Sequence, residues 1–404
     1  MRYTIGQLAE IIDGDRGKNY PKQDEFYPQG YCLFLNTGNV TKEGLTFKEN
    51  QFITKEKDEA LRKGKLKRGD IVYTTRGTVG NAGYYNSNVP YENVRINSGM
   101  VILRANGEIV DARFLYQILK SEYYRPYFKQ YCTGSAQPQL PIKNFSQIYL
   151  NVPDIKTQHR IADILSAYDD LIENNQRQIK LLEEAARRLY KEWFVDLNFP
   201  GHENTKIVDG VPEGWSVYPF SSKVDIMSGG TPKTSIPDYY NGKIPFYTPK
   251  DSDGAFFAYK TQMNITEGGL KNCNSRLYPP KTVIITARGT VGKTTILAVP
   301  MAMNQSCYAL KMKENDAPYY LFFTLNNEIK ALQTMANGGV FNTIIGKTFD
   351  SINIQIPKDP LIYGFEETVR PFMEQIKNKL QANSKLIEAR NRLLPKMMSG
   401  EVEV

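Results

Sequence analysis

Apolar residues recur at alternating steps of four and three positions in the middle of the chain, in an unbroken series. The positions are Ile161, Leu165, Tyr168, Ile172, Asn175, Ile179, Leu182, Ala186, Leu189 and Trp193. A sustained heptad repeat predicts a coiled-coil helix, which we place at residues 156–199. At 1.5 Å per residue such a helix is roughly 60 Å long, which is too long for one small domain to bury.

A second series of the same kind closes the chain and predicts another long helix at residues 358–404. Its positions are Phe365, Val369, Phe372, Ile376, Leu380, Asn383, Ile387, Arg390, Leu394 and Met397. One step is irregular, and Pro371 should kink or delay the helix. The alternative for each series is an amphipathic helix that packs on its own domain.

Two such series in one chain favour pairing of the two helices along their apolar seams. The seam residues we expect in contact are Leu165, Ile172, Ile179, Leu182 and Leu189 with Ile376, Leu380, Ile387 and Leu394. Asn175 and Asn383 would fix the register of the pair, although a solvated break in the seam is an equally good interpretation.

The segments before the two helices repeat each other. "TTRGTVGNAGYY" at residues 74–85 matches "TARGTVGKTTIL" at residues 286–297, an internal repeat. At the same offset Tyr3 falls on Trp215, Gly17 on Gly229, Tyr27 on Tyr239 and Gly30 on Gly242. Further on, "FSQIYLNVP" at 145–153 matches "FDSINIQIP" at 349–357, and its alternating pattern predicts a half-buried strand that ends at a proline.

This repeat defines the organisation that we predict. An α+β chain carries two tandem α/β domains, at residues 1–155 and 200–357, which are joined by two long coiled-coil helices with pseudo-twofold symmetry. The Gly- and Pro-containing stretch at 198–215 connects the repeats.

The composition of the chain argues against a membrane protein and against metal or histidine catalysis, and it favours a polyanionic partner. With 404 residues, more than one domain is expected. No window approaches the roughly 18 apolar residues of a membrane span, and no secretory signal opens the chain, so we expect a cytoplasmic protein. Four separated cysteines and two histidines make a metal site or acid–base catalysis unpromising. The net charge of +8 and the pI near 9.0 favour a polyanionic partner.

Motifs for catalysis are weak. "GTVGKTT" at 289–295 lacks the P-loop glycine, because Ala287 stands in its place, and Asn81 replaces Lys293 in the other copy. No Asn-Pro-Pro-Tyr or Asp-Pro-Pro-Tyr string points to a base-flipping methyltransferase. Acidic residues such as Asp251 could bind a nuclease metal, but in Gly- and Pro-rich loops they are more often turn formers.

Non-catalytic DNA recognition is the interpretation that we favour. A motif that both copies share cannot distinguish two DNA sequences, so we assign it to the fold or to backbone contacts, and assign base reading to loops that differ. Arg76 and Arg288 are the best candidates for backbone contact, although bonding within each domain is an even alternative. The full candidate set is Arg16, Lys18, Tyr20, Lys22, Thr75, Arg76, Gln137, Gln139, Thr231, Lys233, Thr286, Arg288, Lys293 and Asn342. The basic run at 62–69 is more typical of a solvated surface.

Several stretches together resemble the specificity (S) subunit of Type I restriction-modification systems. They are "DGDRGKNYP" with "LNTGN", "QHRIADILSAYDDLIENNQRQIKLLEEAARRLYKEWFVD", "PEGW" followed by "SGGTPKT", and "LLPKMMSGEV". The resemblance implies two target-recognition domains that read a bipartite site on double-stranded DNA, held apart by the two long helices, which it implies are antiparallel. It implies a non-catalytic subunit that directs adenine methylation and restriction by its partners.

The partners that the resemblance implies are two modification (methyltransferase) subunits and restriction (translocase-nuclease) subunits, without a membrane. S-adenosylmethionine, ATP and magnesium are then expected on those subunits, and no cofactor on this chain. Trp193 and Phe194 are candidates for the partner interface on the outer helix faces. The rival interpretations are a self-sufficient nuclease or methyltransferase with an unrecognised site, and a scaffold that does not bind DNA.

Overall fold

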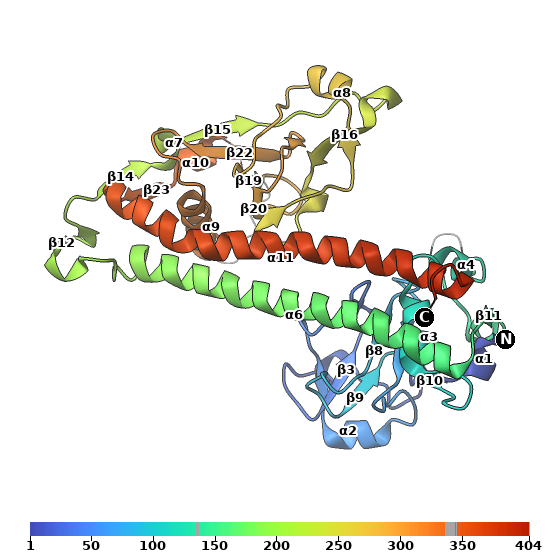
Figure 1. The fold of residues 1–404 in the computed structure, drawn as a ribbon. Helices are drawn as coiled ribbons and strands as arrows, with labels where there is room; N and C mark the ends of the chain where they lie inside the picture. Colours follow the sequence, from blue (N-terminus) through green and yellow to red (C-terminus); the bar gives the residue numbers. More distant parts are fainter. Residues whose placement is uncertain (135–136, 336–343, 345, 404) are drawn as a thin grey trace. The chain divides into compact units, whose positions relative to one another are not determined.

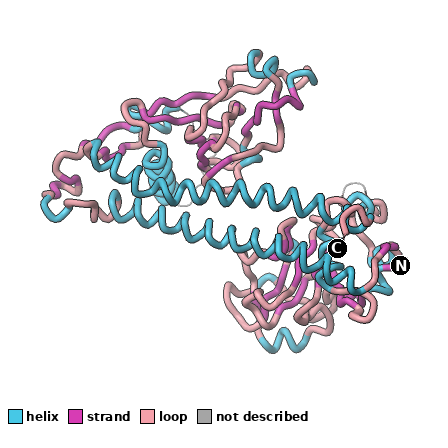
Figure 2. Tube along the Cα trace, viewed as in Figure 1, coloured by secondary structure: helices cyan, strands magenta, loops and turns pink. Residues whose placement is uncertain are grey.

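The computed structural model describes residues 1–134, 137–335, 344 and 346–403, and its internal contacts divide the chain into two units. Unit 1 comprises Met1–Ile172 and Lys385–Val404, and unit 2 comprises Glu173–Ser384. Each unit holds an α/β body and part of both long helices, α6 (Ile155–Phe194) and α11 (Asp359–Ser399), drawn in green and red in Figure 1. Figure 2 shows short strands separated by long loops in each body. Loops of this kind can carry recognition residues.

The body of unit 1 is built on a four-stranded antiparallel sheet. Its order is β2 (Ala9–Asp13), β10 (Met100–Ala105), β7 (Ile71–Thr74) and β8 (Ala82–Tyr84). Because side chains alternate along a strand, Ile71 and Tyr73 face one core and Val72 faces another. The first core contains helix α3 (Ala112–Lys120), and the second contains the sheet β6 (Phe52–Ile53), β3 (Cys32–Leu35) and β9 (Val94–Ile96). The sheet therefore lies between two apolar layers.

The body of unit 2 repeats this plan. Its main sheet has the order β15 (Val224–Ser228), β22 (Cys307–Met312), β19 (Val283–Thr286), β20 (Thr294–Leu297) and β17 (Phe257–Ala258). The second sheet is β18 (Asn264–Ile265), β16 (Tyr240–Tyr247) and β21 (Ala302–Met303), and helix α9 (Pro318–Met335) corresponds to α3. The second sheet of each body contains one parallel pair of strands, which is β3 with β9 in unit 1 and β16 with β21 in unit 2. The predicted repeat of an α+β body is confirmed.

Shorter elements complete the two bodies. Unit 1 contains β1 (Arg2–Thr4), α1 (Ile5–Leu8), η1 (Gln23–Glu25), η2 (Thr37–Asn39), β4 (Val40–Thr41), β5 (Gly44–Leu45), α2 (Lys55–Ala60), α4 (Arg125–Lys129), α5 (Ile142–Ser146) and β11 (Tyr149–Asn151). Unit 2 contains η3 (His202–Asn204), β12 (Ile207–Val208), β13 (Val211–Pro212), β14 (Ser216–Pro219), α7 (Phe220–Lys223), η4 (Pro237–Tyr239), η5 (Pro249–Asp251), α8 (Glu267–Lys271), α10 (Gly346–Asp350) and β23 (Asn353–Ile356). The repeated "FSQIYLNVP" and "FDSINIQIP" begin with the last residues of helices α5 and α10 and continue into strands β11 and β23, which pair with β1 and β14.

Strand register corrects part of the sequence repeat. Asp13 pairs with Val101 in unit 1, and Ser228 pairs with Tyr308 in unit 2, so the glycines that follow are Gly14 and Gly229. A Cβ on either glycine would lie 2.3 or 2.2 Å from a carbonyl oxygen of the neighbouring loop, which explains why both are glycine. The predicted match of Gly17 with Gly229 is therefore wrong.

The match of Tyr3 with Trp215 fails for the same reason. Tyr3 pairs with Leu150 on β11, and the residue in the corresponding place on β14 is Tyr218, which pairs with Ile354. A comparison at one fixed offset cannot accommodate the length difference at the start of the two bodies. The match of Gly30 with Gly242 is confirmed, because both glycines lie against the last residue of the neighbouring short strand.

The two long helices pack on each other within each unit. In unit 2, Asn175 donates a hydrogen bond to Asn383, and Tyr190 packs on Phe365 with ring centroids 5.9 Å apart. Residues later in α6 thus contact residues earlier in α11, which confirms the predicted antiparallel pairing. Helix α11 runs on through Pro371, so the expected delay at this proline did not occur.

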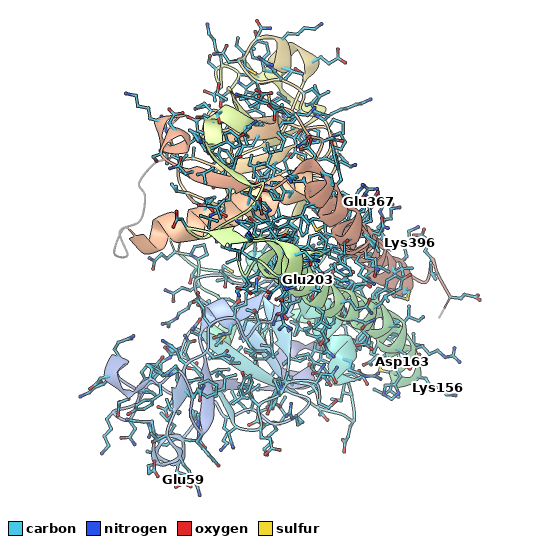
Figure 3. The ribbon with its side chains drawn as sticks, turned by 90° about the vertical axis from the view of Figure 1, so that its left-hand side faces the viewer. Glu59, Lys156, Asp163, Glu203, Glu367 and Lys396 are labelled. Carbon is cyan, nitrogen blue, oxygen red and sulfur yellow. The ribbon has the colours of Figure 1, made fainter. Side chains whose placement is uncertain are left out.

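The seam positions are enclosed to different degrees. Leu165, Ile172, Ile179, Ile376 and Leu394 are buried, and Leu182, Leu189, Leu380 and Ile387 are partly buried. The charged side chains labelled on the helices in Figure 3, Lys156 and Asp163 of α6 and Glu367 and Lys396 of α11, are exposed.

Each unit also places one carboxylate at a helix junction. In unit 1, Asp169 of α6 accepts hydrogen bonds from Lys120 of α3 (3.0 Å) and Arg390 of α11 (2.5 Å). Burial opposes the ionisation of Asp169, but these two cations outweigh it and lower its pKa. In unit 2, Glu366 of α11 accepts the backbone N–H of Tyr320 at 2.7 Å, near the start of α9. Burial raises the pKa of Glu366 to about 7.

Candidate nucleic-acid interface

The repeated Arg-Gly-Thr-Val-Gly motif forms the turn between two strands of the main sheet. In unit 1 the hydroxyl of Thr74 donates to the carbonyl of Thr78 at 2.5 Å and accepts the backbone N–H of Asn81 at 3.0 Å. The N–H of Gly80 donates to the carbonyl of Thr74 at 3.0 Å. Gly77 and Gly80 have φ angles of 69° and 97°, a backbone region that favours glycine.

The turn in unit 2 has the same hydrogen bonds. The hydroxyl of Thr286 donates to the carbonyl of Thr290 and accepts the N–H of Lys293 at 3.0 Å. The N–H of Gly292 donates to the carbonyl of Thr286 at 2.9 Å, and Gly289 and Gly292 have φ angles of 80° and 81°. The repeated letters are thus explained by one turn geometry, which needs a threonine hydroxyl and two glycines.

Each turn presents an exposed arginine side chain. Arg76 and Arg288 are exposed, and neither guanidinium has a hydrogen-bond or ion-pair partner among the residues that the structure describes. Thr75 and Thr286 are buried, and the Thr75 hydroxyl donates to the carbonyl of Gly99 at 3.1 Å. These two threonines therefore shape the turns, and we omit them from the exposed candidate surface.

Three predicted residues of unit 1 gather around the loop that follows β9. The backbone N–H groups of Thr75 and Arg76 donate to the carbonyl of Gly99 at 2.9 and 3.1 Å. The guanidinium of Arg16 donates to the carbonyl of Ser98 at 3.3 Å, and Gln139 pairs with Arg76 through a β-bridge. Arg16, Arg76 and Gln139 therefore lie together although they are far apart in sequence.

Unit 2 repeats this arrangement around the loop that follows β21. The N–H of Ala287 donates to the carbonyl of Ser306 at 2.7 Å, and the hydroxyl of Thr231 bonds the side chain of Gln305. Thr231 and Arg288 therefore flank one loop, as Arg16 and Arg76 do in unit 1. Lys233 and Lys293 are exposed nearby in sequence, and Asn342 lies outside the described residues.

Sequence reasoning missed the loop at the centre of each group. The side chain of Asn97 accepts the N–H of Gly99 at 2.9 Å, and that of Asn304 accepts the N–H of Ser306 at 3.1 Å. The signal was the matching "INSG" and "MNQS", each an asparagine directly after a buried strand. Ser98 lies between the hydrogen-bonded Asn97 and Gly99 in unit 1, and the exposed Gln305 lies between Asn304 and Ser306 in unit 2. The two loops therefore share the same hydrogen bond but differ in the residue between its partners.

A cleft of about 860 Å³ opens beside the turn of unit 1. Its lining includes Thr37, Lys42, Thr78, Arg125, Lys129 and Gly134. Arg125 forms an ion pair with Glu122 at 3.1 Å, whereas Lys129 is exposed without an ion pair in the described part of the chain. Glu43 also lines the cleft and Lys42 forms an ion pair with Glu122 at 3.5 Å, so the cleft adds the exposed Lys129 to the group around Arg76.

Comparison with known proteins identifies the family. The family described as "Type I restriction modification DNA specificity domain" matches residues 1–184 and 212–384, which include most of both repeats. The chain belongs to this family.

Named members resemble the chain over most of its length. The Type I restriction enzyme HindI specificity subunit of Haemophilus influenzae is 25% identical and covers 98% of this chain and 100% of its own. The MjaIX specificity subunit of Methanocaldococcus jannaschii is 26% identical over 83% of this chain and 78% of its own. A Type I S subunit structure from M. genitalium has a TM-score of 0.58 at 16% identity and covers 98% and 95% of the two chains, which supports the fold.

The other predicted residues of unit 1 have no recorded contact with its turn in the described part of the chain. Lys18 and Lys22 are exposed on the loop before β3, and the ring of Tyr20 packs edge-on against Phe34 at 5.8 Å. Gln137 is exposed. No contact in the described residues brings Lys18, Tyr20 or Lys22 to the turn of unit 1.

The basic run and the acidic loop residues have structural partners. Arg68 donates to the carbonyls of Asn86 and Val89, and Lys65 forms an ion pair with the buried Asp58. In unit 2, Asp251 accepts the N–H and hydroxyl of Thr248, each at 2.8 Å, as a turn former does. In the described residues, no group of three or more His, Cys, Asp or Glu side chains is placed to hold a metal ion.

The aromatic pair at the end of α6 packs within unit 2. Trp193 and Phe194 are partly buried, and their rings lie 5.9 and 5.1 Å from that of Phe365 on α11. Their proposed contact with a partner subunit would therefore use only the remaining exposed part of each ring. No helix in the described part of the chain is both long and apolar enough to cross a membrane.

Proposed function

We propose that this chain is the DNA sequence-specificity subunit of a Type I restriction-modification complex and has no catalytic role of its own. It recognises a bipartite site on double-stranded DNA and directs adenine methylation and restriction by partner subunits. The observation that carries the proposal is the family match over both repeats, in which a common turn geometry presents loops of different sequence. The residues at 1–155 and 200–357 act as the two target-recognition domains.

Base reading is assigned to the loops that differ between the units. In unit 1 these carry Arg16, Lys18, Tyr20, Lys22, Gln137 and Gln139, and in unit 2 they carry Thr231, Lys233 and Asn342. Arg, Lys, Asn and Gln make the bidentate contacts that distinguish base pairs in the major groove. Ser98 and Gln305 join this set because they stand at matching positions beside Arg16 and Thr231.

Contact with the DNA backbone is assigned to the shared turns. Arg76 and Arg288 are exposed and lack partners in the described residues, so each can approach a phosphate without losing an internal bond. The net charge of +8 favours association with a polyanion.

The partners are two modification (methyltransferase) subunits and restriction (translocase-nuclease) subunits. These subunits supply S-adenosylmethionine, ATP and magnesium, and the complex acts in the cytoplasm. Exposed faces of α6 and α11 and the accessible edges of Trp193 and Phe194 are the proposed contacts with the modification subunits.

Single-molecule methylation sequencing tests the proposal. A host without other methyltransferases expresses this chain with its modification subunit, and in separate cultures each protein alone. The expected result is methylation of a two-part motif with a fixed gap only when both proteins are present. Methylation by this chain alone would make it an enzyme, and no methylation with both present would contradict the specificity role.

A further inference from the structure

Each shared turn contains a group of main-chain donors that have no acceptor among the residues that the structure describes. The backbone N–H groups of residues 77–79 in unit 1 and 289–291 in unit 2 donate to no atom of the described residues. The N–H groups on either side, of Arg76 and Gly80 in unit 1, are bonded internally. The free donors are consecutive and belong to a turn that contains a glycine of positive φ, the setting in which main-chain N–H groups form anion-binding concavities.

The arginine of each turn stands directly before these donors. Arg76 precedes Gly77, and Arg288 precedes Gly289, and both arginines and both glycines are exposed. A guanidinium next to several main-chain donors is suited to the oxygens of a phosphate group. The same combination occurs in two bodies whose surrounding loops differ, so it does not depend on one local environment.

One position makes the two turns unequal. Asn81 and Lys293 occupy the same place, because the N–H of each donates to the turn threonine at 3.0 Å. The Asn81 side chain is buried and donates to the carbonyl of Val40 at 2.9 Å. Lys293 is exposed, and its ammonium has no partner in the part of the chain that the structure describes. At this position the second turn therefore presents an exposed cation, whereas the first turn presents a buried amide.

We infer that each turn is a binding site for one phosphodiester group of the DNA backbone, and that Lys293 strengthens the second site. This inference rests on the proposed DNA-binding function and extends it to the main-chain donors and to the difference between the two half-sites. In unit 1 the phosphate is held by Arg76 and the N–H groups of residues 77–79. In unit 2 Lys293 joins Arg288 and the N–H groups of residues 289–291.

The first test compares the salt dependence of DNA binding by the assembled complex. Each phosphate contact contributes about 0.9 to the slope of log affinity against log salt, so Lys293→Asn should lower the magnitude of the slope by about 0.9 and weaken binding about eightfold at 0.1 M salt. Lys281→Asn is the matched control. Lys281 is exposed like Lys293, but it lies before strand β19, whereas the turn lies after this strand. The φ angle of Lys281 is 69°, which asparagine tolerates.

The second test locates the phosphate by replacing single linkages with neutral methylphosphonates. Replacement of one particular linkage, in the half-site read by unit 2, should weaken binding by the wild-type complex. The same replacement should weaken binding by the Lys293→Asn complex to a smaller extent. An Arg288→Ala/Lys293→Asn complex should keep a residual sensitivity at that linkage, because the main-chain donors remain. Loss of the residual sensitivity would overturn the main-chain part of the inference.

The outcomes distinguish failure of the phosphate-site inference from failure of the proposed function. A slope and linkage pattern in Lys293→Asn equal to those of Lys281→Asn would overturn the inference while sequence-specific binding persists. Absence of sequence-specific binding by the wild-type complex would instead contradict the proposed function.

Discussion

The buried asparagine pair between the long helices offers a direct measurement of what one polar contact contributes to helix pairing. In unit 2, Asn175 of α6 donates to the side-chain oxygen of Asn383 of α11 at 2.9 Å, and the two residues are only 8% and 6% exposed. The perturbation is Asn175→Ala. The neighbouring Asn174 is exposed on the same helix, so Asn174→Ala is a matched control.

The expected magnitude follows from the burial. Removing one partner of a buried hydrogen bond costs about 1–3 kcal/mol, because the other partner loses a donor where water has little access. Alanine also favours a helix over asparagine by about 0.5 kcal/mol, and this gain occurs in the control as well. The free energy of unfolding of Asn175→Ala should therefore lie about 1–3 kcal/mol below that of Asn174→Ala.

Urea unfolding of the full chain, followed by far-UV circular dichroism, measures this difference. A double-mutant cycle with Asn383→Ala should give a coupling energy of at least about 0.5 kcal/mol, because the two side chains are in contact. Equal unfolding midpoints for the two alanine variants would refute the reasoning and would mean that the seam is solvated at this position.

Three further predictions concern charges. Arg76→Ala and Arg288→Ala should each weaken DNA binding about eightfold at 0.1 M salt without altering the methylated sequence, and a changed motif in methylation sequencing would overturn the backbone assignment. The folded-state pKa of Glu366 is raised to about 7, so its contribution to stability declines as pH rises from about 4.5 to 7. Glu366→Gln should then be about 3 kcal/mol more stable than wild type near pH 8 and similar near pH 4, and parallel pH profiles in urea unfolding would contradict this. The folded-state pKa of Asp169 is lowered, so its stabilisation is present above about pH 4 and declines below it. Asp169→Asn should cost about 3–5 kcal/mol at neutral pH, because it leaves two partly buried cations unneutralised, and a cost below 1 kcal/mol in the same assay would contradict this.

The fold could be predicted from sequence because its two main signals are local. The heptad series fixes which residues of α6 and α11 face inward, and the internal repeat shows that two bodies share one plan. The length difference at the start of the bodies could not be seen at one fixed offset, and only the pairing of Asp13 and Ser228 with equivalent strands reveals it. Similarly, Pro371 is tolerated inside α11 although its ring removes a backbone donor.

The candidate site was predicted less completely, because exposure depends on tertiary structure. Arg76 and Arg288 were found through their repetition. Thr75 and Thr286 were chosen from the same motif, but they are buried, and sequence alone does not show where a strand ends and a turn begins. Asn97 and Asn304 were missed because their equivalence becomes clear only from strand register.

Comparison of the two bodies shows which hydrogen bonds are the same in both and which exposed residues differ. The hydrogen bonds of the turn threonine, of the second turn glycine (Gly80 or Gly292) and of Asn97 or Asn304 recur in both units, and each of them has a backbone group as donor or acceptor. The residues that these bonds present outward differ, as Ser98 and Gln305 do. A change of an outward residue therefore leaves the turn and loop bonds intact. On the proposed function, one half-site can change its sequence preference without loss of the geometry that brings its arginine to the DNA backbone.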